Sequence, residues 1–337
     1  MSTSSSPHAL VDRFGRVHRD LRISLTDRCS LRCTYCMPAE GVPWLPGEAM
    51  LSTDELVRVA TVAVDLGIRA IRLTGGEPLL RPDVVDVVAA LARLGAPGDR
   101  PEISLTTNAL RLPALAGPLK DAGLSRVNVS LDTLDRDRYQ QLTRRDRLPQ
   151  VIAGLAAAQS VGFAPIKVNA VAMRGVNDGE VVDLLRFALE HGYQMRFIEQ
   201  MPLDPGHTWD RTQMVSQAEI LQSLTAEFTL TEAPGRGSAP AQKWLVDGGP
   251  GTVGVIASVS APFCGSCDRL RLTADGQLRA CLFAQSETDV RTVLREGGDD
   301  EAIAVALRAC VAGKRAGHDI DDPGFLQPDR PMSAIGG

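Results

Sequence analysis

The hydrophobic and polar positions of the chain alternate in a pattern that predicts strands and helices in regular succession. Residues 21–26 alternate between apolar and polar side chains, which indicates a strand with two unlike faces. A Ser-Thr-Asp-Glu run at residues 52–55 is a capping box, and it opens a helix expected to end near residue 66. The succession continues with strands over 68–74, 102–107, 126–132, 166–173 and 194–201, and with helices over 82–94, 113–122, 149–161, 179–191 and 217–228. Six strands alternating with six helices predict an α/β fold, a partial (β/α)6 TIM-like barrel that stays open on one side.

The pattern changes after residue 232, so we expect a partial barrel over 14–232 and a distinct C-terminal region over 233–337. A stretch rich in Pro and Gly separates the two regions. The elements expected in the second region are strands over 242–246 and 251–258, a hairpin over 269–281 that turns at Asp275-Gly276, and a helix over 301–312.

One face of the predicted barrel strands is repeatedly polar. Both faces of a parallel strand are ordinarily apolar, and since helices cover the outside, we expect the polar face to line the lumen. Its members are Arg22, Ser24, Arg72, Thr74, Ser104, Thr106, Asn128, Ser130, Asp132, Lys167 and Asn169. Unpaired cations there are costly unless an anion or water meets them, so the sequence predicts a lumen built for a polyanionic ligand. The alternative is a structural network in which these side chains pair with Asp132, Glu77 or Glu199.

Composition narrows the possible functions. With 337 residues, 44% of them hydrophobic, the chain suits one large domain or two unequal ones. The net charge of -5 supplies no basic field for nucleic acid or an anionic membrane, so neither is expected as a partner. No stretch approaches about 18 consecutive apolar residues, and the flexible Ser-rich start at 1–7 lacks the features of a signal peptide. The protein is therefore expected in the cytoplasm.

Three cysteines, Cys29, Cys33 and Cys36, follow the first predicted strand in C-x3-C-x2-C spacing. A 4Fe-4S cluster normally takes four thiolates, so three would leave one iron open to a ligand that is not protein. A structural zinc site would need a fourth Cys or His nearby, and the nearest histidines are His18 and His191. A disulfide framework fits poorly with seven cysteines, an odd number, in a chain expected to be cytoplasmic.

A second group of three thiols, Cys264, Cys267 and Cys281, comes together if the predicted hairpin returns the last of them toward the first two. A zinc site is a stronger alternative here, because C-x2-C with a distant third cysteine is common in zinc proteins and Cys310 could add a fourth ligand. Cys310 lies in an apolar predicted helix, however, and is interpreted as a small buried hydrophobic residue.

A Thr-Gly-Gly-Glu-Pro run at 74–78 stands where the second predicted strand turns toward its helix. Glycines let backbone groups approach a ligand closely, and barrel sites lie at the carboxyl ends of the strands. Taken alone, the Gly-Gly pair is weak evidence for a binding site, because most such pairs merely form turns.

The first cysteine motif, with Tyr35 before its last cysteine, is similar to that of the radical S-adenosylmethionine (SAM) enzymes, and the Gly-Gly-Glu-Pro run resembles the element with which that family binds the SAM amino group. From about Phe14 to Gly337 the chain resembles the GTP 3',8-cyclase family of molybdenum cofactor biosynthesis. The matching motifs are FGR at 14–16, LRISLTDRC at 21–29, CTYCMP at 33–38, RLTGGEPLLR at 72–81, NVSLDTLD at 128–135, KVNAV at 167–171, MRFIEQMP at 195–202, FCGSCDRLRLT at 263–273 and the terminal IGG. Ser30 and Ala109 depart from the family pattern, in which Asn and Gly are usual, and Ala109 restricts positive φ.

The resemblance implies two 4Fe-4S clusters and SAM as cofactors. Cys29, Cys33 and Cys36 would hold the cluster that binds SAM, while Cys264, Cys267 and Cys281 would hold a cluster whose open iron binds the guanine of GTP. The residues implied to contact SAM are Tyr35, Gly76, Ser130 and Met201. Those implied to contact GTP are Arg22, Arg72, Thr106, Lys167, Arg269, Leu270 and Arg271, with Arg269 and Arg271 also implied to be catalytic.

The implied reaction makes the chain a lyase that turns GTP into (8S)-3',8-cyclo-7,8-dihydroguanosine 5'-triphosphate, the first step of molybdopterin formation. Reduction of SAM would give a 5'-deoxyadenosyl radical that removes the 3' hydrogen of the ribose, after which the C3' radical attacks C8 of guanine. A one-electron reduction and a protonation would then give the product. The implied partners are an external one-electron donor, a second copy in a homodimer, and a downstream cyclic pyranopterin monophosphate synthase. The alternatives are another radical SAM enzyme with an auxiliary cluster, and an iron-sulfur electron carrier, which the open ligation of both triads disfavours.

The chain ends in Met-Ser-Ala-Ile-Gly-Gly. Chain ends are usually disordered and dispensable, and Pro328 and Pro331 exclude a long terminal helix. Two residues without side chains can nevertheless enter a narrow channel. With the resemblance, Gly336 and Gly337 are expected to reach the active site beside the arginines that contact GTP.

Overall fold

The computed structural model describes residues 9–204 and 206–336. The Ser-rich start at 1–7, expected to be flexible, and Gly337 of the terminal pair lie outside the described residues. Within the described ranges, no helix has the length and apolar character needed to cross a membrane.

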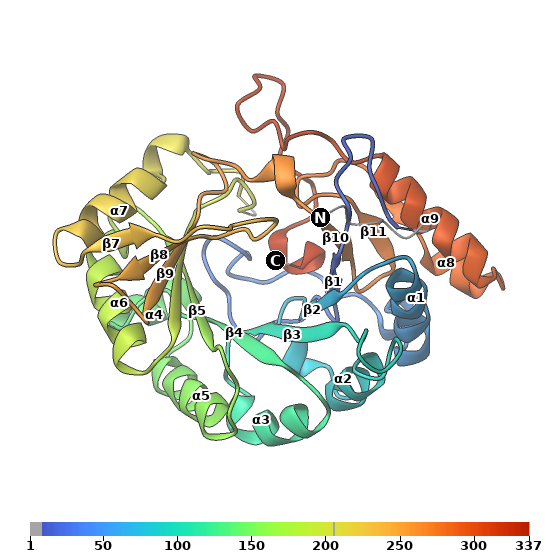
Figure 1. Cartoon of the computed structure of the whole chain (residues 1–337), viewed down its shortest axis with the longest axis horizontal. Helices are drawn as coiled ribbons and strands as arrows, with labels where there is room; N and C mark the ends of the chain where they lie inside the picture. The colour runs from blue at the N-terminus through green and yellow to red at the C-terminus, as the bar shows by residue number, and fades with distance from the viewer. Residues whose placement is uncertain (1–8, 205, 337) are drawn as a thin grey trace.

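Parallel strands and their crossover helices form the barrel in the order in which they occur along the chain (Figure 1). The strands are β1 Asp20–Ser24, β2 Ala70–Thr74, β3 Glu102–Thr107, β4 Arg126–Ser130, β5 Lys167–Ala172 and β6 Gln194–Glu199. The helices are α1 Thr53–Asp65, α2 Val84–Leu91, α3 Leu112–Asp121, α4 Arg136–Thr143, α5 Leu148–Ser160, α6 Val181–Glu190 and α7 Gln217–Thr225. Short 3-10 helices at Gly47–Ala49, Pro78–Leu80, Asp178–Glu180, Arg211–Gln213 and Cys264–Ser266 lie in the connections. The predicted partial barrel is confirmed, and each element expected in it forms within a few residues of its predicted bounds.

Helix starts were predictable where a cap and an apolar stripe occur together. Ser52 Oγ accepts a hydrogen bond from Glu55 N at 3.2 Å, and the Glu55 carboxylate accepts one from Ser52 N at 2.8 Å, so the predicted capping box opens α1. Helix α4 is absent from the sequence-based prediction. Its sequence is mostly polar, and few of its side chains are buried, Tyr139 and Leu142 among them, so no apolar stripe marks it.

The C-terminal region adds strands to both edges of the barrel sheet. Its elements are β7 Leu230–Glu232, β8 Gln242–Val246, β9 Thr252–Ile256, β10 Arg269–Leu272, β11 Gln277–Arg279, β12 Thr288–Asp289, α8 Arg291–Arg295, α9 Asp300–Ala312 and α10 Met332–Ile335. Strand β9 pairs parallel with β6, and β10 pairs parallel with β1, so the described sheet ends at β12 on one side and β7 on the other. The barrel therefore stays open, and the predicted hairpin forms as β10 and β11. The division of the chain after residue 232 remains a prediction.

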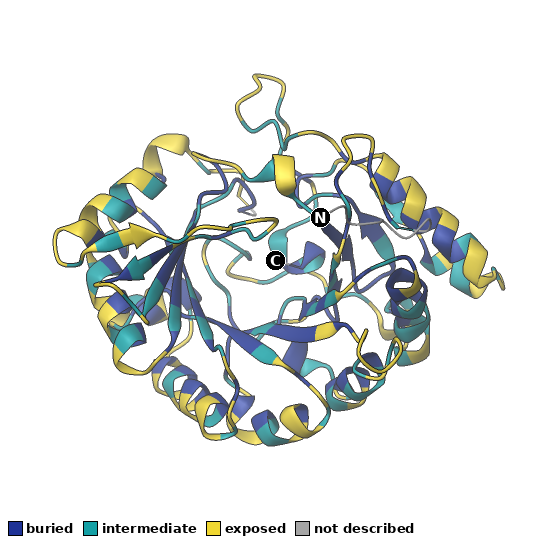
Figure 2. Ribbon diagram, viewed as in Figure 1, coloured by how far each residue is buried: buried dark blue, intermediate teal, exposed yellow. Residues whose placement is uncertain are grey.

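The two faces of the barrel strands have different surroundings. Leu21 and Ile23 of β1 and Ile71 of β2 are fully shielded in the main hydrophobic core, against the helices. Figure 2 shows the strands buried inside a ring of helices whose outer faces are exposed. The register sets Arg22 opposite Arg72 between these shielded positions. As predicted, the polar face turns toward the lumen.

Candidate active site

A cavity of about 320 Å³ runs through the barrel and reaches both cysteine triads. The first triad follows the carboxyl end of β1. Cys264 and Cys267 precede β10, which is parallel to β1, so they lie at the opposite end of the same strand pair. Cys281 follows β11, which is antiparallel to β10, and returns to that end as the hairpin prediction requires. The triads therefore occupy the two ends of the lumen, and the arginines of β1, β2 and β10 lie between them.

The cavity wall contains most of the residues that the sequence pointed to. These are the cysteines of both triads, Tyr35, Gly76, Ser130, Met201, Arg22, Arg72, Thr106, Arg269 and Arg271. Lys167 begins β5 and is not part of the wall. Leu270 is completely shielded in the main core because it lies on the apolar face of β10. Its side chain points away from the lumen, which leaves any contact with GTP to its backbone.

The paired glycines after β2 hold the segment that leads to the first triad. A Cβ at Gly75 would lie 2.4 Å from Thr26 O, and φ there is 141°. A Cβ at Gly76 would lie 2.4 Å from Arg28 O, so no side chain fits at either position. The close approach lets Gly76 N donate to Thr26 O and Glu77 N donate to Arg28 O, both at 2.7 Å. The glycines thus join the end of β2 to the backbone just before the first cysteine.

Burial raises the pKa of all three thiols of the first triad. Desolvation raises the pKa of Cys29 to about 11 and that of Cys36 to about 12, and it raises the pKa of Cys33 well above its usual value. Beside them, burial raises the pKa of Asp132 to about 6, and its carboxylate accepts a hydrogen bond from Tyr35 Oη at 2.8 Å. Thiols that resist ionisation by themselves need a metal to become thiolates, which suits ligands of an iron cluster better than free nucleophiles.

The two departures from the family pattern lie side by side. Asn108 Nδ2 donates to Ser30 Oγ at 3.2 Å and also approaches Cys29 Sγ at 4.0 Å. Ala109 has a φ of 66°, so the turn keeps the left-handed backbone that glycine adopts more easily. A Cβ at Gly154 of α5 would lie 2.3 Å from Ala109 O, which shows how tightly the helix packs under this turn.

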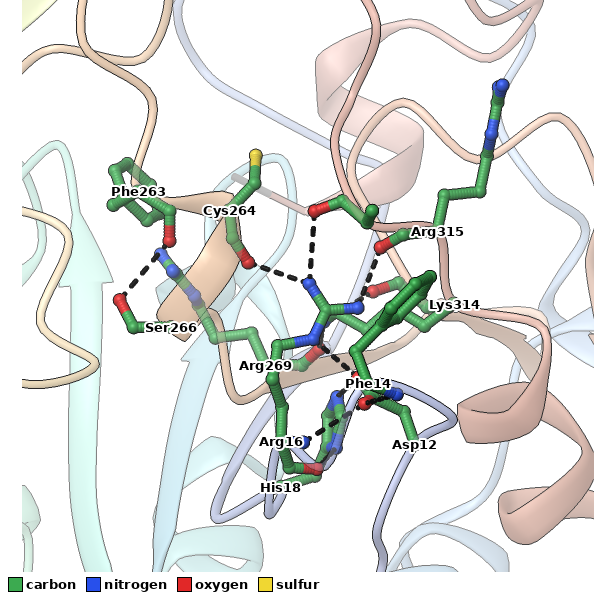
Figure 3. A network of polar contacts seen from close by, with 12 residues as sticks. Asp12, Phe14, Arg16, His18, Phe263, Cys264, Ser266, Arg269, Lys314 and Arg315 are labelled. Atoms are coloured by element: carbon green, nitrogen blue, oxygen red, sulfur yellow. Dashed lines mark hydrogen bonds and ion pairs between the residues drawn. The ribbon is translucent and has the colours of Figure 1, made fainter.

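The N-terminal arm clamps the loop of the second triad (Figure 3). Arg16 of the FGR motif donates from Nη1 to Cys264 O and from Nη2 to Arg315 O, each at 2.7 Å. The buried Asp12 carboxylate holds the same guanidinium at 2.5 Å. Arg16 therefore ties the arm, the cysteine loop and the segment after α9 together, which is the contribution of the FGR motif.

Positive charge surrounds one thiol of the second triad. Burial by itself would raise the pKa of Cys267, but the charges of Arg269 and Lys314 and the hydrogen bonds that they donate lower it to about 7. Burial raises the pKa of Cys264 to about 11. The guanidinium carbon of Arg269 also lies 4.4 Å from the centre of the Phe263 ring, within the range of a cation–π contact. The Cys267 thiol therefore ionises more readily than that of Cys264.

The lumen holds more positive charge than the protein neutralises. Desolvation, together with Arg72 and Arg271, lowers the pKa of Arg22 well below its usual value, and within the described chain the Nε atom of Arg22 has no hydrogen-bond partner. Desolvation likewise lowers the pKa of Arg271 to about 10 and that of Lys167 to about 7. Cations crowded in this way favour an anion that carries several charges.

The acids proposed as structural partners of these cations are engaged elsewhere. Glu77 accepts hydrogen bonds from the N–H groups of Asn108 and Leu79, Glu199 from those of Gln217, Val259 and Ser260, and Asp132 from Val171 N–H and the Tyr35 hydroxyl. The alternative of a structural network among them and the lumen cations is therefore wrong. Burial would raise the pKa of Asp20, but Arg72 and Arg22 outweigh it and lower that pKa. A single carboxylate at this place does not balance the arginines around it.

Arg196 is a wall residue that the sequence prediction did not assign. It lies opposite Asn169 in the pairing of β6 with β5, and desolvation, Arg72 and Arg126 lower its pKa to about 9. A signal was present, because Arg196 stands at a polar position between two buried apolar residues of its strand. Asn108, Phe263 and His318 also line the cavity. They lie outside the strands, where no periodic pattern marks a face.

The C-terminal tail lies inside the ring of strands (Figure 1). Ile335 of α10 is buried in a second hydrophobic cluster, and the backbone of Ser333 lies beside the Cys36 thiol. Gly336 has a φ of 86°, and a Cβ there would lie 2.6 Å from Thr74 Oγ1. The expectation that the tail enters a narrow channel is therefore confirmed for Gly336.

Comparisons with known sequences agree with this geometry. The Radical SAM superfamily model matches residues 23–188, and the Molybdenum Cofactor Synthesis C model matches residues 193–320. A GTP 3',8-cyclase of Streptomyces coelicolor is 58% identical over 333 residues, which are 98% of this chain and 97% of that protein. GTP 3',8-cyclase 2 of Mycobacterium tuberculosis is 59% identical over 334 residues, which are 97% of this chain and 92% of that protein.

Solved structures support the fold. Streptococcus suis SuiB bound to S-adenosylmethionine has a TM-score of 0.58 at 15% identity and covers 87% of this chain and 69% of its own. Native anSMEcpe with bound AdoMet has a TM-score of 0.56 at 12% identity and covers 89% of this chain and 82% of its own. At such low identity these structures show the fold alone. The sequence relatives reach further, because their identity is high and extends over nearly the whole length, and the chain therefore belongs to the GTP 3',8-cyclase family of radical SAM enzymes.

Proposed function

We propose that this protein is a lyase that converts GTP into (8S)-3',8-cyclo-7,8-dihydroguanosine 5'-triphosphate, the first step of molybdenum cofactor biosynthesis. The reaction joins C3' of the ribose to C8 of guanine within one nucleotide. The observation that carries the proposal is the placement of two cysteine triads at the ends of one lumen, with unbalanced arginines between them. A nucleoside triphosphate carries the several negative charges that such a lumen favours.

Two 4Fe-4S clusters and SAM are the cofactors. Each triad supplies three thiols, all free and all facing the cavity, which fits a cluster with one open iron. Cys29, Cys33 and Cys36 would hold the cluster that binds SAM, and Cys264, Cys267 and Cys281 the cluster that meets GTP. When bound, these cofactors supply one-electron chemistry through reductive cleavage of SAM, while the protein supplies position and charge.

The roles proposed for the site residues follow from the family resemblance and, for those in the cavity wall, from their place between the triads. Tyr35, Gly76, Ser130 and Met201 would contact SAM beside the first triad. Arg22, Arg72, Thr106, Lys167 and the backbone or side chains of Arg269, Leu270 and Arg271 would contact GTP. Arginine suits the phosphates because its planar fork binds two oxygens at once. Arg269 and Arg271, which lie in β10 between Cys267 and Cys281, are the proposed catalytic residues.

The proposed partners follow from the chemistry. Cleavage of SAM consumes an electron, so an external one-electron donor is required, and a cyclic pyranopterin monophosphate synthase would take the product. A homodimer is also proposed. Seven free cysteines are typical of a reducing compartment, which favours the cytoplasm.

The decisive experiment is anaerobic incubation of the iron-loaded protein with GTP, SAM and dithionite, followed by mass spectrometry. We expect 5'-deoxyadenosine and the cyclised nucleotide in similar amounts. The alternative, another radical SAM enzyme with an auxiliary cluster, predicts 5'-deoxyadenosine without any change in GTP. As a control, the protein with Cys264, Cys267 and Cys281 replaced by Ala should still release 5'-deoxyadenosine but form no cyclised nucleotide.

A further inference from the structure

Lys314 is a buried lysine beside the second triad. It follows the end of α9, and 3% of it is exposed. Its ammonium donates hydrogen bonds to Arg269 O at 2.6 Å and to Ala280 O at 2.9 Å, and it lies beside the thiol of Cys267. An ammonium has three donors, and two of them are bound to these carbonyls. A buried lysine held in this way has a defined position in the interior.

The two carbonyl partners come from facing ends of the β10–β11 hairpin. Arg269 begins β10 two residues after Cys267, and Ala280 directly precedes Cys281. One ammonium therefore joins the two strands where they present their cysteines.

No carboxylate of the described chain forms an ion pair with Lys314. Desolvation lowers the pKa of Lys314, whereas the thiolates of Cys267 and Cys281 raise it. The acidic groups near this buried ammonium are thus the cysteines of the second triad. A buried cation at this position stabilises negative charge that is added to a cluster held by these cysteines.

We infer that Lys314 is a positioning residue of the auxiliary cluster, one that sets the spacing of Cys267 and Cys281 and raises the reduction potential of the cluster through its charge. Hydrogen bonds to cluster sulfurs and net charge are known determinants of such potentials. Reduction adds negative charge, and the ammonium favours the reduced form. The inference rests on the proposed ligation by Cys264, Cys267 and Cys281.

The test uses the full chain with Cys29, Cys33 and Cys36 replaced by Ala, so that the auxiliary cluster is observed alone. Lys314→Met, Lys314→Gln and Lys314→Arg are made in this background, with Cys310→Ala on the neighbouring turn of α9 as the matched control. After anaerobic loading, iron content and the midpoint potential are measured, the latter by a redox titration followed by electron paramagnetic resonance. We expect about four irons in each protein, a lower potential in the Met and Gln variants, and a potential near that of the parent in the Arg variant and the control.

The outcomes separate the two hypotheses. If the parent protein takes up no iron, the assignment of the cluster to these cysteines fails, whatever the role of Lys314. If the parent loads but all Lys314 variants share its potential, or the control shifts as far as the Met variant, the inference is overturned. If the Met variant does not load, the Gln and Arg variants decide, because only a lower potential in Gln than in Arg supports the role of the charge. Loss of iron from Gln and Arg alike, with the control intact, would reduce Lys314 to a packing residue.

Discussion

The guanidinium of Arg271 in β10 donates a hydrogen bond to the backbone carbonyl of Gly336. Arg271 faces the lumen, so the last described residue of the tail meets one of the arginines proposed to contact GTP. The backbone of the neighbouring Ser333 lies beside Cys36 of the first triad. The tail therefore contacts both groups that must cooperate in the reaction, and it forms part of the site wall.

Deleting Gly336 and Gly337 should uncouple the reaction. Without the Gly336 carbonyl, Arg271 loses a partner that orients it, and a small displacement of a positioning group costs on the order of 100-fold in rate. We expect the cyclised nucleotide to fall by about that factor or more, with both clusters and the release of 5'-deoxyadenosine largely intact. Gly336→Ala should act in the same direction, because its Cβ would lie 2.6 Å from Thr74 Oγ1. If the truncated protein cyclised GTP at the full rate, the two terminal glycines would have no role in the reaction.

The two triads should load independently, because they lie at opposite ends of the lumen. Replacing Cys29, Cys33 and Cys36 by Ala should remove about half of the iron and all cleavage of SAM. Replacing Cys264, Cys267 and Cys281 should leave the cluster that binds SAM in place. Iron analysis and absorption spectra measure both effects, and retention of roughly eight irons by either variant would contradict the assignment.

The local parts of the fold could be predicted, because each depends on residues close together in the chain. The capping box at Ser52, the alternation in β1 and the Asp275-Gly276 turn are of this kind. The alternation also marks Leu270 as a core residue, although the resemblance placed it among the GTP contacts. Prediction failed for α4, because no hydrophobic periodicity in its residues marks a helix.

The supports of the site could not be predicted, because they join residues far apart in the sequence. The hydrogen bond from Arg16 to Cys264 O spans 248 positions, and no local pattern indicates it. The bridge from Lys314 to Arg269 O and Ala280 O depends on the path of the chain after α9. The cysteines were recognisable by their spacing, but the contacts that hold their loops required the folded chain.

Gly76→Ala should disturb the first triad alone. Its Cβ would lie 2.4 Å from Arg28 O and 2.5 Å from Asp27 O, so the backbone before Cys29 must shift. We expect about half of the iron to be lost, weaker SAM binding and a lower melting temperature, with the second cluster retained. Gly117→Ala in α3 is the matched control, since a Cβ there meets nothing within 4 Å and should stabilise the helix by about 0.5–1 kcal/mol. Equal effects of the two substitutions would refute the role of the close approach.

Lys167 should make GTP binding depend on pH. Desolvation and the charges of Arg196, Arg126 and Arg72 lower its pKa to about 7, and a bound triphosphate would favour its protonated form. Binding should therefore take up a fraction of a proton above pH 7, and affinity should fall as pH rises from 7 to 9. Calorimetry in two buffers of different ionisation enthalpy measures the uptake.

Lys167→Met should remove this proton uptake and weaken GTP binding at pH 6.5 by about 1.5–3 kcal/mol, the range for a hydrogen bond to a charged group. SAM binding should change little, because the proposed SAM contacts lie beside the first triad. An equal loss of affinity for both ligands would indicate that Lys167 supports folding instead. The same linkage predicts that the folded protein gains stability as pH rises above 7, since the unfolded chain, where Lys has its ordinary pKa, then binds more protons.

Arg330 anchors the tail outside the lumen, so its replacement should loosen the tail without altering Gly336. Its guanidinium donates to both carboxylate oxygens of Asp275, at 3.1 and 2.8 Å, and contacts Glu287 at 2.8 and 3.0 Å. The Arg330 side chain is 27% exposed, so Arg330→Gln should cost only about 1 kcal/mol of global stability. The local effect on the tail should be larger, because fewer contacts then hold it, among them the apolar contact of Ile335 and the hydrogen bond from Arg271 to Gly336 O. We expect faster amide exchange at residues 332–336 and about a tenfold lower yield of cyclised nucleotide per SAM cleaved, a smaller effect than deletion of the glycines.

Arg308→Gln, which breaks an exposed ion pair with Glu301 on α9, is the control and should change neither quantity. Wild-type exchange and yield in Arg330→Gln would show that the ion pairs lie on the surface without holding the tail, and that Ile335 and the hydrogen bond from Arg271 suffice.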